Sequence, residues 1–211
     1  AGATFEEQPE YELPLNAYAY SKLLFDQYVR KQRSTEFQCV GLRYFNVYGD
    51  REQHKGRMAS VAYHFFHQYR KHGKVRLFEA SAGYANGEQR RDFVSVEDVV
   101  KVNLYLLEHP QVSGIFNVGT GRSQSFNEVA LAVVNSLRQE SGQGLLTVEA
   151  AQEAGAIEYI PMPEALAGKY QSFTEANIEA LRGVGYEAPF FSVEEGVARY
   201  IDRLREKAES A

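Results

Sequence analysis

Short apolar runs typical of buried strands alternate along this chain with helices that have clear start and stop signals. A buried strand is predicted over residues 39 to 45, and a helix from about 58 to 72 that ends at Gly73. Strands that alternate with helices favour a parallel sheet, because a parallel pair needs a crossover connection. The sequence therefore predicts an α/β fold with a largely parallel sheet over at least residues 1 to 120.

The same signals predict the elements of the rest of the chain. Ser95 with Asp98, and Ser125 with Glu128, have the spacing of capping boxes, so a helix is expected after each serine. Residues 139 to 155, rich in Gly, Gln and Ala, are expected to be a surface insertion with marginal structure, and 49 to 56 a polar loop. The other predicted strands are 75 to 79, 90 to 94, 115 to 118 and 157 to 160, and the other predicted helices follow Asn16, Thr174 and Ser192.

Composition excludes several classes of protein. The 211 residues are 44% hydrophobic, which suffices for a sizeable core in one or two domains. A net charge of −5 argues against nucleic acid or an anionic membrane as the main partner, and no apolar run is long enough for a membrane span. A single cysteine, Cys39, rules out an internal disulfide and predicts a cytoplasmic protein. No metal site is expected, because the histidines lack a carboxylate partner on the same face.

Tyr18 and Lys22 are one turn apart on the helix predicted after Asn16. A free phenol titrates near about 10, and a nearby ammonium group favours tyrosinate, which makes tyrosine a usable general base. Taken alone the pair is a weak signal, because 14 tyrosines and eight lysines give about 0.5 such spacings by chance. A pair of exposed surface neighbours is the alternative.

Further motifs follow this pair in order, and together they resemble extended short-chain dehydrogenase/reductase enzymes that act on nucleotide sugars. A more specific group of segments resembles the branch of that family that epimerises ADP-heptose. The general motifs are Tyr-Ala-Tyr-Ser-Lys at 18 to 22, Arg-Tyr-Phe-Asn-Val-Tyr-Gly at 43 to 49, Arg-Asp-Phe-Val at 91 to 94 and Phe-Asn-Val-Gly-Thr-Gly at 116 to 121. The specific ones are His-Lys-Gly-Arg-Met-Ala-Ser at 54 to 60, Leu-Phe-Glu at 77 to 79 and Gly-Lys-Tyr-Gln-Ser-Phe-Thr at 168 to 174.

The resemblance implies the C-terminal part of a Rossmann-like parallel sheet plus a smaller α/β substrate-binding domain. Residues 1–50 and about 91–125 would be the remainder of the NADP-binding domain, and about 51–90 and 126–211 mainly the substrate domain. These residues contain no G-x-x-G-x-x-G turn of the kind that binds a cofactor pyrophosphate in this family. The chain is therefore expected to be a C-terminal portion that is inactive alone.

The resemblance also implies the reaction, which is inversion at carbon six of ADP-D-glycero-D-manno-heptose through a transient ketone. Tightly bound NADP, with NAD as the alternative, would carry the redox step. Tyr18 would take the hydroxyl proton, with Lys22 lowering its pKa and holding the nicotinamide ribose. Lys55 would be the second acid/base group, needed once the ketone has turned its other face. A solvated loop lysine is the alternative for Lys55.

Other positions are assigned to binding on the same resemblance. Each has a structural alternative, which is strand termination for Asn46, solvation for Arg57, a hydrogen-bonded core position for His64, an ion pair for Arg91 and core packing for the aromatic residues. The expected cofactor contacts are Tyr18, Lys22, Val47 and Lys55. The expected substrate contacts are Asn46, Arg57, His64, Phe78, Glu79, Ala80, Ser81, Arg91 and Tyr170.

Two other functions stay open on the sequence. One is a different nucleotide-sugar 4-epimerase or a 4,6-dehydratase, whose distinguishing acidic residue would lie upstream of residue 1. The other is a non-catalytic binding or assembly module, supported by the missing glycine-rich turn. For the leading hypothesis we expect a nucleotide-sugar partner, a role in lipopolysaccharide core synthesis and a homo-oligomer.

Overall fold

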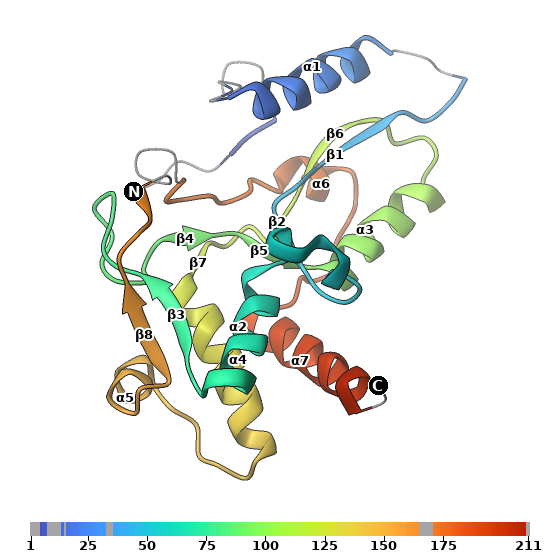
Figure 1. Ribbon diagram of the computed structural model, residues 1–211. Helices are drawn as coiled ribbons and strands as arrows, with labels where there is room; N and C mark the ends of the chain where they lie inside the picture. Colours follow the sequence, from blue (N-terminus) through green and yellow to red (C-terminus); the bar gives the residue numbers. More distant parts are fainter. Residues whose placement is uncertain (1–4, 8–13, 15, 33–35, 165–170, 210–211) are drawn as a thin grey trace.

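The computed structural model describes residues 5–7, 14, 16–32, 36–164 and 171–209, and it confirms the α/β fold (Figure 1). Helix α1 lies at one end, above strands β1 and β6, and helices α2, α4 and α7 gather in the body. The helices are α1 Ala17–Lys31, the 3-10 helix η2 Gln53–Met58, α2 Val61–His72, α3 Val96–Glu108, α4 Phe126–Glu140, α5 Val148–Glu153, α6 Glu179–Gly183 and α7 Val193–Glu209. The strands are β1 Val40–Tyr44, β2 Asn46–Tyr48, β3 Val75–Phe78, β4 Arg90–Arg91, β5 Phe93–Ser95, β6 Gly114–Val118, β7 Gln124–Ser125 and β8 Ile157–Ile160.

The described strands pair two by two. Strands β1 and β6 are parallel with Leu42 opposite Phe116, and β2 and β5 are parallel with Val47 opposite Val94. Strand β3 runs parallel to β8, whereas β4 and β7 are antiparallel. Three of the four pairs are therefore parallel, as the alternation of strands and helices predicts.

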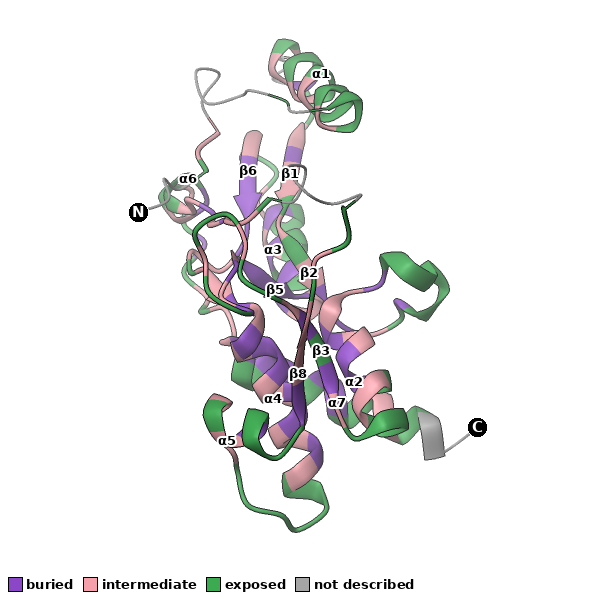
Figure 2. Cartoon of the chain, turned by 60° about the vertical axis from the view of Figure 1, so that its left-hand side comes forward, coloured by how far each residue is buried: buried purple, intermediate pink, exposed green. Residues whose placement is uncertain are grey.

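Two hydrophobic clusters form the core of the described residues (Figure 2). The larger cluster packs α2, α4 and α7 against β3 and β8, and includes the fully buried Phe66 and Val133. The smaller cluster joins β1, β6, α3 and α6, and includes Val118 and Leu181. No helix of the described segments is both long and apolar enough to cross a membrane.

Local sequence signals explain how several helices begin and end. Glu128 donates its amide to the Ser125 hydroxyl at 3.2 Å and accepts from the Ser125 amide at 2.5 Å, so the predicted capping box of α4 is confirmed. Ser60 caps α2 by accepting from the Tyr63 amide. Gly73 ends α2 at φ 68°, a left-handed conformation that favours glycine.

Two expected capping roles are wrong. Asp98 does not complete a capping box, because its buried carboxylate instead accepts from the Phe191 amide and from Lys101, both at 2.8 Å. Thr174 does not start a helix, since α6 begins at Glu179. In both cases a contact far along the chain wins over the local pattern.

Three other predictions need correction. The single strand expected at 90 to 94 is two strands, β4 and β5, which pair with different partners on either side of Asp92. The polar loop expected at 49 to 56 contains the start of η2. The insertion expected at 139 to 155 contains α5, whose Ala151 is fully buried in the larger cluster.

Candidate functional site

Helix α1 presents Tyr18 and Lys22 on one face. Asn16 caps this helix by accepting from the Ala19 amide at 2.8 Å. The Lys22 Nζ atom lies 5.0 Å from the centroid of the Tyr18 ring, so the ammonium group and the phenol are neighbours. In the described chain Tyr18 is 72% exposed. The pair is therefore formed by the helix alone and faces outward.

Only one residue of α1, Val29, is buried (Figure 2). Asp26 holds the helix to β1 through an ion pair with Arg43 at 2.7 Å. Arg30 adds a hydrogen bond to the Glu7 carbonyl oxygen. Polar contacts thus supply much of the attachment of the helix that carries Tyr18.

The structure brings Asn46 next to the Arg-Asp-Phe motif. The backbone N–H of Asn46 donates to the Asp92 carbonyl oxygen at 3.0 Å, where β2 begins alongside β5. Arg91 is the preceding residue of that motif, and its side chain is only 6% exposed. The Arg91 guanidinium donates to the Arg90 carbonyl oxygen and lies 5.9 Å from the Phe126 ring centroid. Val47, next to Asn46, is half-buried.

Asp92 is a junction that the sequence did not single out. Its fully buried carboxylate accepts from the Thr120 amide, the Thr120 hydroxyl, the Gly121 amide and the Ala176 amide at 2.7 to 3.1 Å. Burial raises the pKa of this carboxyl, and these hydrogen bonds act in the opposite direction. A side chain at Gly119 would meet the Asp92 carboxylate at 2.7 Å, so this turn requires glycine. The Arg-Asp-Phe motif was the available signal, but only its arginine was assigned a role.

The segment after residue 170 runs beside Arg90. The Arg90 amide donates to the Ser172 carbonyl oxygen, and the Thr174 amide donates to the Arg90 carbonyl oxygen. Tyr170 lies outside the described residues. The described end of the 168 to 174 motif is therefore adjacent to Arg91.

Lys55 and Arg57 both lie on the exposed helix η2, which follows β2. Glu52, the residue before η2, is only 3% exposed. Its carboxylate accepts from the amide and the hydroxyl of Ser60 and from the hydroxyl of Tyr200. Sequence reasoning missed Glu52, because it sits among polar residues that predict a solvated loop.

His64 lies on the first turns of α2 and is half-buried. Its ring is 5.9 Å from the Tyr63 ring, centroid to centroid, in an edge-on arrangement. In the part of the chain that the structure describes, no three His, Cys, Asp or Glu side chains form a group that could hold a metal ion.

The predicted substrate segment, Phe78 to Ser81, begins at the last residue of β3. A buried glutamine, Gln89, holds it by donating to the Glu79 carbonyl oxygen at 3.0 Å and to the Ser81 hydroxyl at 2.8 Å. The Ala80 amide donates to Asn86 at 2.8 Å. Glu79 and Ala80 are exposed, whereas Phe78 and Ser81 are half-buried. This segment is fixed in place and open to solvent.

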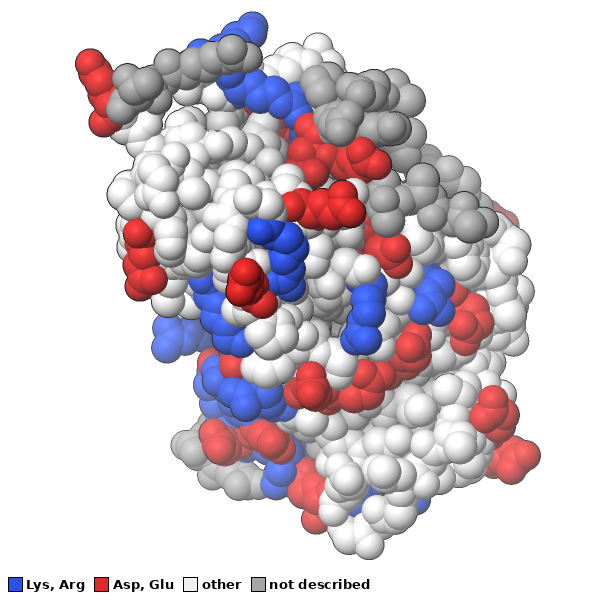
Figure 3. Space-filling model, turned by 180° about the vertical axis from the view of Figure 1, so that it is seen from behind, with Lys and Arg blue, Asp and Glu red and all other residues white. Residues whose placement is uncertain are grey.

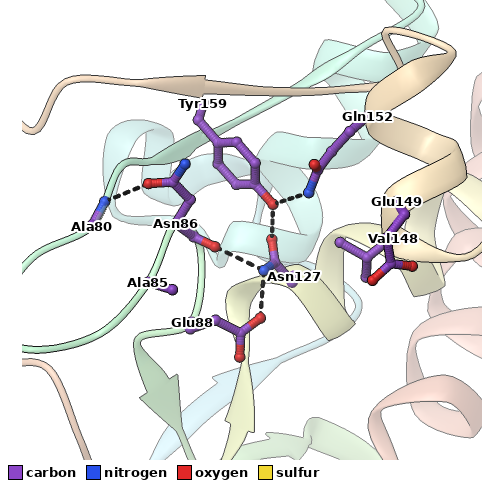
Figure 4. A pocket seen from close by; sticks show the side chains of 9 residues that line it. All are labelled: Ala80, Ala85, Asn86, Glu88, Asn127, Val148, Glu149, Gln152 and Tyr159. Carbon is purple, nitrogen blue, oxygen red and sulfur yellow. Dashed lines mark hydrogen bonds between the residues drawn. The ribbon is translucent and has the colours of Figure 1, made fainter.

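A pocket of about 420 Å³ opens beside Ala80 (Figure 4). At its base the buried Asn127 donates to Glu88 at 2.6 Å and accepts from the Tyr159 hydroxyl at 2.9 Å. Gln152 donates to the Tyr159 hydroxyl, whose pKa is raised by burial. These side chains form a continuous chain of hydrogen bonds along one wall of the pocket.

Charges of both signs are interspersed on the described part of the face opposite to that of Figure 1 (Figure 3). Glu97 pairs with Arg199 at 3.0 Å and with Arg203 at 2.7 Å, which joins α3 to α7. The two arginines are partly exposed, so each of these ion pairs contributes little to stability.

Known proteins resemble this chain in sequence and in structure. Over 97% of its length the chain is 63% identical to the ADP-L-glycero-D-manno-heptose-6-epimerase of Thiobacillus denitrificans, of which it covers 62%. The crystal structure of the Helicobacter pylori enzyme of that name superposes with a TM-score of 0.73 at 31% identity, covering 97% of this chain and 56% of the other. The Thermus thermophilus UDP-glucose 4-epimerase, solved with NAD, gives a TM-score of 0.71 at 28% identity, covering 97% and 58%.

The chain thus spans about 62% of the length of the Thiobacillus relative. The model of one family, described as "NAD dependent epimerase/dehydratase family", matches residues 2–119, which is more than half of the chain. That stretch includes α1, β1 and β6 as well as the Arg-Asp-Phe motif. The chain belongs to the NAD dependent epimerase/dehydratase family.

Proposed function

We propose that the intact protein is an NADP-dependent epimerase that converts ADP-D-glycero-D-manno-heptose into its L-glycero epimer. The observation that carries this proposal is the 63% identity to a heptose epimerase over 97% of the chain. The identity continues past residue 119, where the family model ends, into the residues assigned to the substrate domain. The UDP-glucose 4-epimerase of Thermus thermophilus is less similar, at 28% identity.

Tyr18 is proposed as the base that takes the proton of the carbon-six hydroxyl as the ketone forms. The Lys22 ammonium group lies 5.0 Å from the Tyr18 ring centroid and is proposed to hold the nicotinamide ribose beside that base. A nicotinamide, when bound, supplies the acceptor and donor of the hydride. The phenol and the ammonium group fit the edge of such a cofactor, since one can bind the reacting oxygen and the other the ribose hydroxyls. NADP is proposed over NAD from the resemblance of the 54 to 60 and 168 to 174 segments.

Lys55 is proposed as the second acid/base group. The ketone has to turn its other face to the cofactor before it is reduced. Its oxygen then lies away from Tyr18, so a separate group has to donate the proton. The ammonium group of a lysine can supply this proton through any of its three N–H donors.

Binding of the nucleotide sugar is assigned to residues around β2, β4 and the end of β3. Asn46 would bind the sugar, Arg91 the diphosphate, and Phe78 to Ser81 the adenosine. The hydrogen bond from Asn46 to Asp92 supports this assignment, because it sets Asn46 beside the residue that follows Arg91. Arg57, His64 and Tyr170 complete the proposed substrate contacts. Val47 would lie against the nicotinamide.

The same proposal covers the setting of the reaction. ADP-heptose is a soluble nucleotide sugar, so we place the enzyme in the cytoplasm, where it would supply precursors of the lipopolysaccharide core. We also propose a homo-oligomer. Residues 1–50 and 91–125 would belong to the NADP-binding domain, and most of the remainder to the substrate domain.

The test uses the intact protein with ADP-D-glycero-D-manno-heptose, and chromatography to resolve the two epimers. Tyr18→Phe is expected to lower kcat by about 10²- to 10⁴-fold, the usual effect of losing an acid/base group, with little change in sugar binding. Tyr20→Phe is the matched control, because Tyr20 is an exposed tyrosine of the same helix and has no assigned role. Its kcat should stay at the wild-type value.

Other outcomes would contradict the proposal in distinct ways. Unchanged turnover in Tyr18→Phe would remove the assigned base. Turnover of UDP-glucose but not of ADP-heptose, or loss of water from the sugar, would indicate another branch of the family. If NADP and NAD titrations of the intact protein both showed no binding, the protein would be a binding module and not a redox enzyme.

A further inference from the structure

Lys55 lies on a helix that has little support of its own. No residue of η2 is buried, so the helix is not held by packing of an apolar face. Gly56, within it, has φ 54° and ψ −122°, which interrupts the helical geometry one residue after Lys55. Short 3-10 helices also have poor hydrogen-bond geometry. The position of Lys55 therefore depends on contacts at the two ends of η2.

Glu52 joins those two ends. Its carbonyl oxygen accepts from the Lys55 amide at 2.9 Å, at the start of η2. Its carboxylate reaches past the far end, where Oε2 accepts from the Ser60 amide and Oε1 from the Ser60 hydroxyl, both at 2.6 Å. The segment between Glu52 and Ser60 is thus closed into a loop by one side chain.

A third hydrogen bond ties this loop to the core. The Tyr200 hydroxyl donates to Oε1 of Glu52 at 2.8 Å, from a position 148 residues further along the chain. Tyr200 belongs to α7 and is 3% exposed within the larger hydrophobic cluster. Since α7 packs against α4, the loop that carries Lys55 takes its position from the core.

The Glu52 carboxylate lies at the N-terminus of α2, where negative charge is favoured, and accepts from the amide of Ser60, the N-cap residue. The Ser60 hydroxyl caps the helix separately, by accepting from the Tyr63 amide. A buried carboxylate is costly unless other groups compensate, and among the described residues no lysine, arginine or histidine forms an ion pair with Glu52. The three donors therefore hold the charge in one orientation, next to the helix that carries Lys55.

We propose that Glu52 is the positioning residue for Lys55, holding the second acid/base group in place through Ser60 and Tyr200. The inference rests on the proposed function, because it takes Lys55 as part of the reaction. Glu52 itself would not touch the substrate.

The first test is kinetic and uses the intact protein. Glu52→Gln keeps the shape but turns an amide nitrogen toward a donor, and Tyr200→Phe removes one hydroxyl with less risk to folding. Both are expected to lower kcat by about 10-fold or more, with KM within about 3-fold of wild type. Tyr48→Phe is the matched control, because Tyr48 is equally buried beside Tyr200 and its hydroxyl has no hydrogen-bond partner among the described residues. A folded Glu52→Gln protein with wild-type kcat would overturn the proposal.

A double-mutant cycle separates positioning from general support of the fold. In a Lys55→Met background, Glu52→Gln should lower the remaining kcat by less than about 2-fold, because the group that it positions is already gone. If the two losses multiply, Glu52 acts independently of Lys55 and the proposal is wrong.

The second test does not depend on activity. The rate of amide hydrogen exchange in residues 53 to 58 is measured by mass spectrometry, relative to residues 129 to 137 of α4 in the same sample. Loss of the anchor should raise this rate by about 3-fold or more in Glu52→Gln and Tyr200→Phe, and leave it unchanged in Tyr48→Phe. An unchanged rate in Glu52→Gln contradicts the proposal. This readout still decides the role of Glu52 if the wild-type protein shows no epimerase activity, a result that would overturn the proposed function alone.

Discussion

Thr120 donates both its amide and its hydroxyl to the same carboxylate oxygen of Asp92, at 2.7 and 2.8 Å. The other oxygen of Asp92 accepts from the amides of Gly121 and Ala176. One buried side chain therefore fixes the turn after β6 against the segment that precedes α6.

Asp92→Asn is expected to destabilise the protein more than its small change of shape suggests. The new amide nitrogen would face the Gly121 and Ala176 amides, leaving buried donors without an acceptor. The free energy of unfolding should fall by about 2 to 4 kcal/mol, as measured by urea denaturation. Thr120→Val is the smaller companion change, since it removes one donor to Asp92 and the acceptor of the Arg122 amide, which is exposed to water, and it should cost about 1 kcal/mol. Equal losses in the two variants would contradict the junction role of Asp92.

Acid should weaken the contact between Asp50 and the last turn of α7. The hydrogen bond from Lys207 holds the pKa of the Asp50 carboxyl below its usual value of 3.8, so the folded protein keeps this group charged to lower pH than the unfolded chain. The stabilisation is complete above about pH 4 and is lost as the pH falls through the folded pKa. The pair is partly exposed, so its contribution is below about 1 kcal/mol.

The measurement compares wild type with Asp50→Asn in urea at pH 7 and at pH 3. The free energy of unfolding of wild type should exceed that of Asp50→Asn at pH 7, and this difference should be smaller at pH 3. Asp202→Asn serves as the control. Asp202 is an exposed carboxylate on α7, the helix that carries Lys207, and lies 3.6 Å from Arg205. A difference between wild type and Asp50→Asn that grows as the pH falls would contradict the predicted direction.

Gly87 and Gly73 allow a steric effect to be separated from backbone strain. Both have φ 68°, a left-handed conformation, so alanine is strained at either position. A Cβ at Gly73 meets no atom within 4 Å, whereas one at Gly87 would collide with the side chain of the buried Asn127. Gly87→Ala should therefore cost about 1 to 3 kcal/mol more than Gly73→Ala in thermal or urea unfolding. Similar losses would mean that Asn127 moves freely.

Much of the fold could be predicted because strands and helix caps depend on near neighbours. The strand at 157 to 160 and the capping box at Ser125 follow from residues a few positions apart, and both are confirmed. The predictions at Asp98 and Thr174 were wrong because distant groups compete there, such as the Phe191 amide for Asp98. Local patterns carry no information about such partners.

The candidate site could likewise be predicted only where it depends on residues that are close in the sequence. Tyr18 and Lys22 are neighbours because they are one helical turn apart, and this much the sequence predicts. Their roles, and those of Lys55 and Arg91, stay predictions. Glu52 escaped notice because its partner Tyr200 is remote and nothing nearby in the sequence indicates that a glutamate there is buried.

The bond between Tyr200 and Glu52 also sets an order of events during synthesis. Because Tyr200 lies 148 residues after Glu52, Glu52 emerges from the ribosome long before its third donor exists. The η2 region can reach its final arrangement only after translation of α7. A nonsense mutation just ahead of α7 would leave every residue of η2 in the product and still deprive it of its anchor.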